Sequence, residues 1–177
     1  SQRKRGAEED GTVEARSLNE RLEMHEEAVR AVIEDPLESK ARGKDQKKEK
    51  KAKRKAIKQA LKAEDDGEPR RPRVFVLDFD GDMQASQVDQ LREEVSAILP
   101  VVGEADKVLL RLESGGGVVH GYGLAASQLM RFKDAGITLT ISVDKVAASG
   151  GYMMACVGDE IIAAPFAILG SIGVIAQ

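Results

Sequence analysis

The stretch Lys107-Val-Leu-Leu-Arg-Leu-Glu-Ser-Gly-Gly-Gly117 is an apolar strand that runs directly into three consecutive glycines. The segments on either side alternate in type, with strands expected over 74–79, 137–143 and 160–164 and helices over 86–99 and 121–133. Strands that alternate with helices through short connections are typical of an α/β protein with a mainly parallel sheet. The sequence therefore predicts an α/β body.

The first 72 residues differ from the rest in composition. Residues 1–72 carry 20 basic and 17 acidic side chains and no aromatic one. Residues 73–177 carry 7 basic and 13 acidic side chains together with all six aromatic residues. Because a packed core needs large apolar side chains, we expect a charged extension over 1–72 and a globular domain over 73–177.

The extension has two parts. Apolar residues recur on one face over 17–33, which predicts a helix that Pro36 brings to an end. Residues 40–63 hold twelve Lys or Arg against two acidic residues, and we interpret this run as a solvated helix or a disordered spacer. The alternative is attraction to anionic lipid or nucleic acid. Since the run lacks aromatic residues that could stack on bases, we do not expect a nucleic-acid partner.

Membrane and redox signals are sparse. No stretch reaches the roughly 18 apolar residues of a membrane span. The basic cluster Arg3-Lys4-Arg5 is typical of a membrane-helix flank, so an anchor just before this sequence is one interpretation and a solvated terminus is the other. The single cysteine, Cys156, cannot form an intramolecular disulfide, and its apolar neighbours predict a small buried side chain.

The loop Ser114-Gly-Gly-Gly117 follows the second predicted strand, where α/β proteins place their sites. Consecutive glycines allow a peptide N–H to turn outward toward a bound carbonyl, as an oxyanion hole requires. A phosphate-binding loop would continue with Lys and Ser or Thr, and no Lys follows here. A plain tight turn is the remaining alternative.

The segment Val146-Ala-Ala-Ser-Gly-Gly-Tyr152 places a serine between small residues at the start of a predicted helix. Small neighbours leave room for a substrate near the hydroxyl of Ser149, and the N–H of Gly150 is a candidate second oxyanion donor. Serine is also a favoured helix cap, so an N-cap role for Ser149 is the competing interpretation.

A serine nucleophile needs a base, and the sequence offers none that suits. His25 lies in the extension, and His120 is expected to start a helix. Lys145 stands beside Asp144 in a turn, where a lysine stays charged, whereas a lysine base must lose its proton. We therefore expect a base that is either absent or located beyond Gln177.

Three motifs in this order resemble the signal peptide peptidase A family of serine proteases, and most closely its inner-membrane members. They are Leu112-Glu-Ser-Gly-Gly-Gly117, Ala147-Ala-Ser-Gly-Gly-Tyr152 and Gly170-Ser-Ile-Gly-Val174. The resemblance covers nearly the whole chain. It implies a crotonase-like (ClpP-like) fold and a Ser–Lys dyad with Ser149 as nucleophile.

The resemblance also assigns the remaining site residues. It implies that Gly116 and Gly150 donate to the oxyanion, that Ser171 helps hold the catalytic lysine, and that this lysine follows Gln177. A Gly-flanked turn without a catalytic role is the other interpretation of Ser171. Gly115 departs from the family, which usually has proline there, and a glycine loosens the loop.

The resemblance implies a hydrolase of the bacterial inner membrane, anchored by a segment outside this sequence. It implies unfolded or hydrophobic peptides as substrates, a homo-oligomer that restricts access, and no cofactor or metal. Residues 1–177 alone are expected to be inactive. Two alternatives remain: a crotonase-like acyl-CoA enzyme without a nucleophile, and a non-enzymatic membrane scaffold with a decayed site.

Overall fold

The computed structural model describes residues 12–60 and 71–173. Within these ranges the helices of the N-terminal extension form one compact unit, and the residues from Arg71 onward belong to another. No helix among the described residues is both long enough and apolar enough to span a bilayer.

The extension is a pair of helices, α1 (Leu18–Ile33) and α2 (Pro36–Ala60). The hydroxyl of Ser17 caps α1 by accepting a hydrogen bond from the N–H of Glu20. Pro36 is the first residue of α2, a position where proline's missing N–H has no cost. The lysine-rich run is therefore helical as far as Ala60. The sequence left open whether the lysine-rich run is a solvated helix or a disordered spacer. For the part up to Ala60, the spacer interpretation is wrong.

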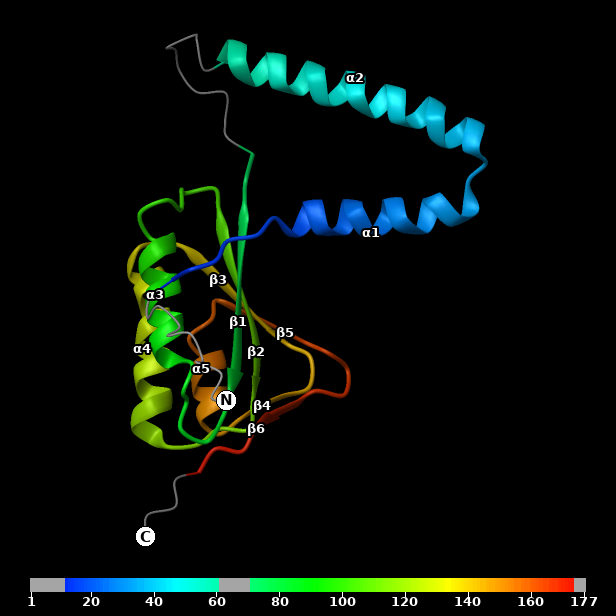
Figure 1. The fold of residues 1–177 in the computed structure, drawn as a ribbon. Helices are drawn as coiled ribbons and strands as arrows, with labels where there is room; N and C mark the ends of the chain where they lie inside the picture. The colour runs from blue at the N-terminus through cyan, green and yellow to red at the C-terminus, as the bar shows by residue number, and fades with distance from the viewer. Residues whose placement is uncertain (1–11, 61–70, 174–177) are drawn as a thin grey trace, which may run out of the picture. The chain divides into compact units, whose positions relative to one another are not determined.

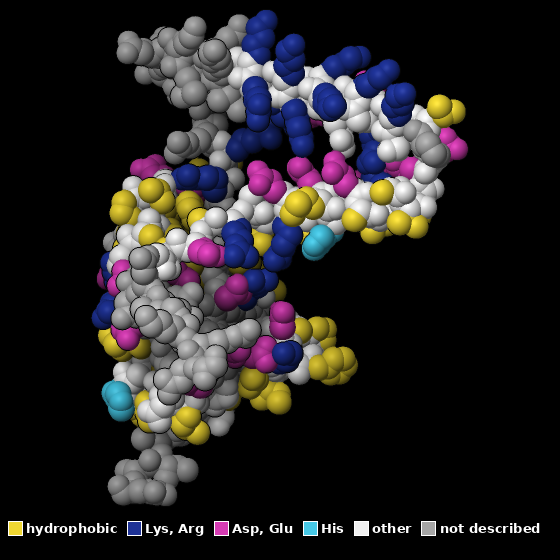
Figure 2. All heavy atoms as spheres, viewed as in Figure 1, with side chains coloured by type: hydrophobic (Ala, Val, Ile, Leu, Met, Phe, Trp, Pro, Cys, Tyr) yellow, Lys and Arg dark blue, Asp and Glu magenta, His cyan; other side chains and the backbone are white. Residues whose placement is uncertain are grey.

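The contact between α1 and α2 consists of charged side chains and includes no buried residue of α1. No residue of α1 is buried. Acidic side chains gather on the side of α1 that faces α2, while apolar side chains lie on its other side (Figure 2). Glu34 forms an ion pair with Arg42 of α2 at 2.9 Å. The side chains of Glu34 and Arg42 are 15% and 30% exposed, so this ion pair is partly buried and only partly screened by solvent.

The second unit is built on a six-stranded sheet in which every pairing is parallel (Figure 1). Its strands are β1 (Val74–Gly81), β2 (Lys107–Ser114), β3 (Thr138–Val143), β4 (Val146–Ala148), β5 (Glu160–Ala163) and β6 (Ile168–Gly170). β2 pairs with β1 along its whole length. On its other side β2 pairs first with β3, up to Arg111, and then with β4 at Ser114.

The sheet therefore divides into two arms beyond β2. β5 extends the arm that begins with β3, and β6 extends the arm that begins with β4. The result is a curled parallel sheet, which confirms the predicted α/β, crotonase-like (ClpP-like) body with a helical N-terminal extension.

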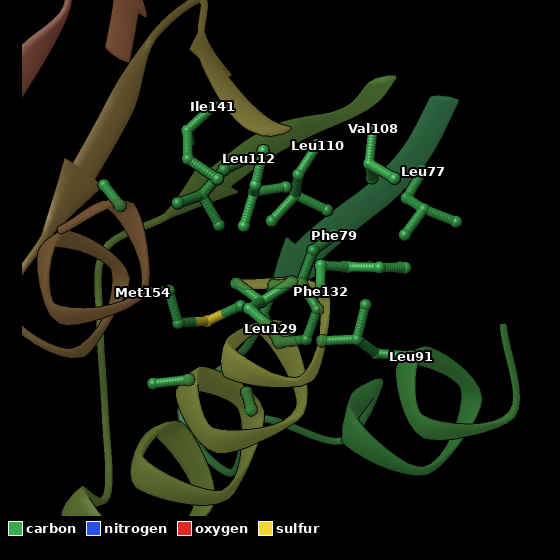
Figure 3. Close-up of a cluster of buried hydrophobic side chains, with 14 of the residues drawn as sticks. Leu77, Phe79, Leu91, Val108, Leu110, Leu112, Leu129, Phe132, Ile141 and Met154 are labelled. Atoms are coloured by element: carbon green, nitrogen blue, oxygen red, sulfur yellow. The ribbon is translucent and has the colours of Figure 1, made fainter. Parts of the chain in front are cut away.

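Three helices, α3 (Val88–Ile98), α4 (Val119–Asp134) and α5 (Gly150–Ala155), pack against this sheet. Alternate residues of β1 and β2 point toward them, as the two-residue period of a strand requires. Leucine, phenylalanine and methionine side chains fill the space between (Figure 3). The intervening strand residues are more exposed and include an ion pair between Asp78 and Arg111 at 2.6 Å.

Two local expectations need correction. Residues 146–148 form the strand β4 and residues 168–170 form β6, and the sequence predicted neither of them. Cys156 is exposed, so the prediction of a buried side chain is wrong. It follows the last residue of α5 and lies off the helix face that carries the buried Met154 and Ala155.

Candidate active site

The candidate site lies where four parallel strands end together. Gly81 of β1 pairs with Ser114 of β2, Ser114 pairs with Ala147 of β4, and Ala148 of β4 pairs with Gly170 of β6. Parallel strands present their carboxyl ends at one edge of a sheet, and ligand sites form there. Ser149 and Ser171 are the first residues after β4 and β6, and Gly116 is the second residue after β2.

Ser149 occupies the turn between β4 and α5 in a conformation unusual for a residue with a side chain. Its φ is 51° and its ψ is −117°. It stands at the N-cap position of α5, but its side chain makes no capping hydrogen bond. The N-cap interpretation of Ser149 is therefore wrong. Strained backbone of this kind persists where surrounding structure enforces it and clusters at functional sites.

Gly116 lies directly against Ser149. Its φ is +87°, and a Cβ atom added to it would meet the Cβ of Ser149 at 2.6 Å and the nitrogen of Gly150 at 2.8 Å. The structure thus brings together the predicted nucleophile and both predicted oxyanion donors. The N–H of Gly116 donates to the Oγ of Ser114 at 3.0 Å, so this donor already has an acceptor.

Ser171 also lies beside this group. The N–H of Ser149 donates to the carbonyl oxygen of Gly170 at 2.8 Å, which ties the end of β4 to the end of β6. Ser171 follows, exposed, with a φ of 54°. Its role in holding a lysine stays a prediction.

None of the candidate bases among the described residues forms a hydrogen bond with the hydroxyl of Ser149. Across residues 12–60 and 71–173, no side chain forms a hydrogen bond with the Oγ of Ser149. Lys145 instead pairs with Glu113 at 2.9 Å, and this hydrogen bond raises the pKa of Lys145. Its side chain is 74% exposed. A charged, exposed lysine cannot accept a proton from serine at neutral pH.

The two histidines offer no better base. His120 is exposed in the first turn of α4, and His25 lies in α1 of the extension. The described residues also hold no cluster of three or more His, Cys, Asp or Glu side chains that could bind a metal ion.

Sequence reasoning missed two polar side chains behind the glycine loop. The Oγ of Ser114 lies 2.5 Å from the Oη of Tyr122, and Tyr122 donates to the carbonyl oxygen of Asp82 at 2.7 Å. Burial raises the pKa of Tyr122, so it keeps its proton. A signal was present: Tyr122 belongs to the buried stripe of α4 with Ala125 and Leu129, and a buried tyrosine hydroxyl needs a partner.

Comparison with known proteins places this α/β domain in a family of peptidases. The profile "Peptidase family S49 N-terminal" matches residues 1–129, and "Peptidase family S49" matches residues 131–177. The chain belongs to peptidase family S49, which confirms the resemblance found in its motifs.

Several similar proteins carry the name of a protease. The chain is 66% identical over 106 residues to "Probable protease SohB" of Buchnera aphidicola subsp. Schlechtendalia chinensis, covering 60% of this chain and 35% of that protein. It is 63% identical over 116 residues to "Probable protease SohB" of Haemophilus influenzae, covering 66% and 33%. A more distant match, 31% over 94 residues, is "Protease 4" of Salmonella typhi, covering 53% and 14%. The chain spans about a third of the length of the SohB relatives.

Proposed function

We propose that the full-length protein is a serine endopeptidase of the Ser–Lys dyad type with Ser149 as its nucleophile. The observation that carries this proposal is the uncapped Ser149, in a strained turn, in contact with Gly116. Helix caps normally adopt extended backbone and use their side chain as acceptor, and Ser149 does neither. A strand-to-helix turn that exposes a serine hydroxyl is the arrangement of a nucleophile elbow.

The reaction begins when the Oγ of Ser149 attacks the carbonyl carbon of the scissile peptide and gives its proton to a neutral lysine amine. The carbonyl oxygen becomes an oxyanion and accepts hydrogen bonds from the N–H groups of Gly116 and Gly150. The tetrahedral intermediate then expels the amine product, which takes the proton from the lysine ammonium. Water, deprotonated by the same lysine, releases the acyl group and restores Ser149.

The lysine comes, in this proposal, from residues that follow Gln177 in the full-length protein. Two observations support an external base: Lys145 is charged and paired with Glu113, and His120 is exposed on α4. Ser171, at the end of β6 beside Ser149, is proposed to orient that lysine. Residues 1–177 alone are then inactive.

The proposed setting is the bacterial inner membrane, with peptides or membrane-associated polypeptides as substrates and a homo-oligomer as the working form. The basic cluster at the start of the sequence supports membrane proximity. Large apolar side chains exposed on and near β5 and β6 support a further protein contact, and they are Ile161, Ile162, Phe166, Ile168 and Ile172.

The test is labelling by a fluorophosphonate, which reacts with activated serines. In the full-length protein we expect one label on Ser149, and Ser149→Ala should lose both the label and peptide hydrolysis. Ser127→Ala, on the exposed side of α4, is the matched control and should keep both. Absence of labelling in the unaltered protein would support a scaffold. Thioester hydrolysis that survives Ser149→Ala would support an acyl-CoA enzyme.

A further inference from the structure

Hydrogen bonds connect Gly116 of the glycine loop with the side chains of Ser114 and Tyr122. Tyr122 has one proton and gives it to the carbonyl oxygen of Asp82 at 2.7 Å. The hydroxyl of Ser114 lies 2.5 Å from the Oη of Tyr122 and 3.2 Å from the carbonyl oxygen of Gly81, to which it can also donate, and its lone pairs accept from the N–H of Gly116 at 3.0 Å. The orientation of the Gly116 peptide is thus linked, through two hydroxyls, to the loop after β1.

Tyr122 also contacts the turn that carries the nucleophile. A Cβ atom added to Gly150 would overlap the ring of Tyr122, and one added to Gly81 would lie 2.5 Å from its hydroxyl. The side chain is 0% exposed. One residue of α4 therefore touches the ends of β1 and β2 and the start of α5.

The glycine loop needs such a restraint. Gly115 is exposed, and an added Cβ atom there would meet nothing within 4 Å. Three consecutive glycines lose much conformational entropy when they are ordered. The loop is held at its far end by the N–H of Val118, which donates to the carbonyl oxygen of Met83 at 2.9 Å. At its near end, the bond from Gly116 to Ser114 holds it.

We infer that Ser114 and Tyr122 are positioning residues for the oxyanion loop, an inference that rests on the proposed function. The Ser114 hydroxyl holds the Gly116 peptide beside Ser149 until the substrate oxyanion replaces it as acceptor. The exchange favours the transition state because a hydrogen bond to a charged acceptor is roughly twice as strong as one to a neutral hydroxyl.

The first test is steady-state peptide hydrolysis by the full-length protein with Ser114→Ala or Tyr122→Phe. Complete loss of an oxyanion donor costs about 10²–10³ in kcat, and a misoriented donor costs less, so we expect kcat to fall about tenfold with KM within about twofold. The double variant should be no slower than the slower single variant, because both changes break one chain. Ser127→Ala on α4 is the control. Unchanged kcat, a higher kcat, or a change confined to KM would overturn the inference.

The second test does not depend on catalysis. In glycine-labelled full-length protein, amide exchange at Gly116 should accelerate at least about tenfold in Ser114→Ala, since its acceptor is gone. Gly117, whose N–H donates to no described residue, is the internal reference. Unchanged exchange at Gly116 would overturn the inference, whether or not the protein proves to be a peptidase.

A second substitution that restores activity can distinguish two roles of Ser114, orientation of the glycine loop and packing of the core. Gly115→Pro, which stiffens the loop at an exposed position, should restore part of the kcat lost in Ser114→Ala. If Ser114 mattered only for packing, the proline would restore nothing, and the inference would fail. If the unaltered protein neither hydrolyses peptides nor labels at Ser149, the proposed function fails by itself.

Discussion

Gly116 and Ser149 are in such close contact that a methyl group on one would collide with the side chain of the other: an added Cβ on Gly116 would lie 2.6 Å from the Cβ of Ser149. The same atom would lie 2.7 Å from the carbonyl oxygen of Ala148. The loop after β2 and the turn after β4 are thus held at a spacing that only glycine permits. The contact fixes the distance between Ser149, the proposed nucleophile, and Gly116, a proposed oxyanion donor.

Gly116→Ala should therefore lower both activity and stability. With a φ of +87°, alanine is strained by about 1–3 kcal/mol even before the collision. Displacement of the donor should lower kcat about 100-fold. Steady-state hydrolysis and urea unfolding measure the two effects. Gly115→Ala is the matched control, because its Cβ meets nothing within 4 Å, and it should change kcat by less than about threefold.

Removal of the nearest lysine in sequence should leave the chemistry intact. Lys145 is paired with Glu113, and this pairing raises its pKa, so it does not act as the base. Lys145→Met should change kcat/KM by less than about threefold, because exposed ion pairs contribute little. The acidic limb of the pH–rate profile should also keep its midpoint. A loss of 100-fold or more would identify Lys145 as the base.

The core beneath the site should be sensitive to truncation. Phe132 of α4 is completely buried between the helix and the sheet (Figure 3). Phe132→Ala should lower the free energy of unfolding by about 3–5 kcal/mol, measured by denaturant titration. Met130→Ala, two residues away on the exposed side of the same helix, should cost less than about 1 kcal/mol. Equal costs would mean that α4 packs through another face.

Asp106 should make the stability of the body depend on pH. Hydrogen bonds from the side chain of Arg73, at 2.6 Å and 3.1 Å, and from the N–H of Gly103 hold the pKa of Asp106 well below its usual value. A lowered folded-state pKa stabilises the protein above the unfolded-state pKa, about 3.9, and this stabilisation is lost as the pH falls toward the folded-state value.

The measurement compares Asp106→Asn with the unaltered protein across pH. We expect the variant to be less stable from about pH 5 to pH 8 by a constant amount, and the difference to shrink below about pH 4. A difference that grows as the solution becomes more acidic would show that the carboxylate is not stabilised by Arg73. Tyr152→Phe, remote from this pair in sequence, serves as the pH control.

Four of the six strands and the site motifs were readable from local patterns, because buried parallel strands are short apolar runs and oxyanion loops need glycine. β4 and β6 were missed because each has only three residues, and only their pairing with each other and of β4 with β2 defines them. The strain at Ser149 and the bond from Tyr122 to Asp82 were equally unreadable. Both depend on contacts between residues distant in sequence, which no local pattern records.

The pairing order of the sheet has a consequence for synthesis. β2 pairs with β1, β3 and β4 pair with β2, β5 pairs with β3, and β6 pairs with β4. Every strand after the first thus finds a partner that has already left the ribosome. Parallel sheets are slow to fold when distant partners must search for each other. Here the sheet can grow strand by strand during translation, and the turn at Ser149 takes its final shape only when Gly170 arrives.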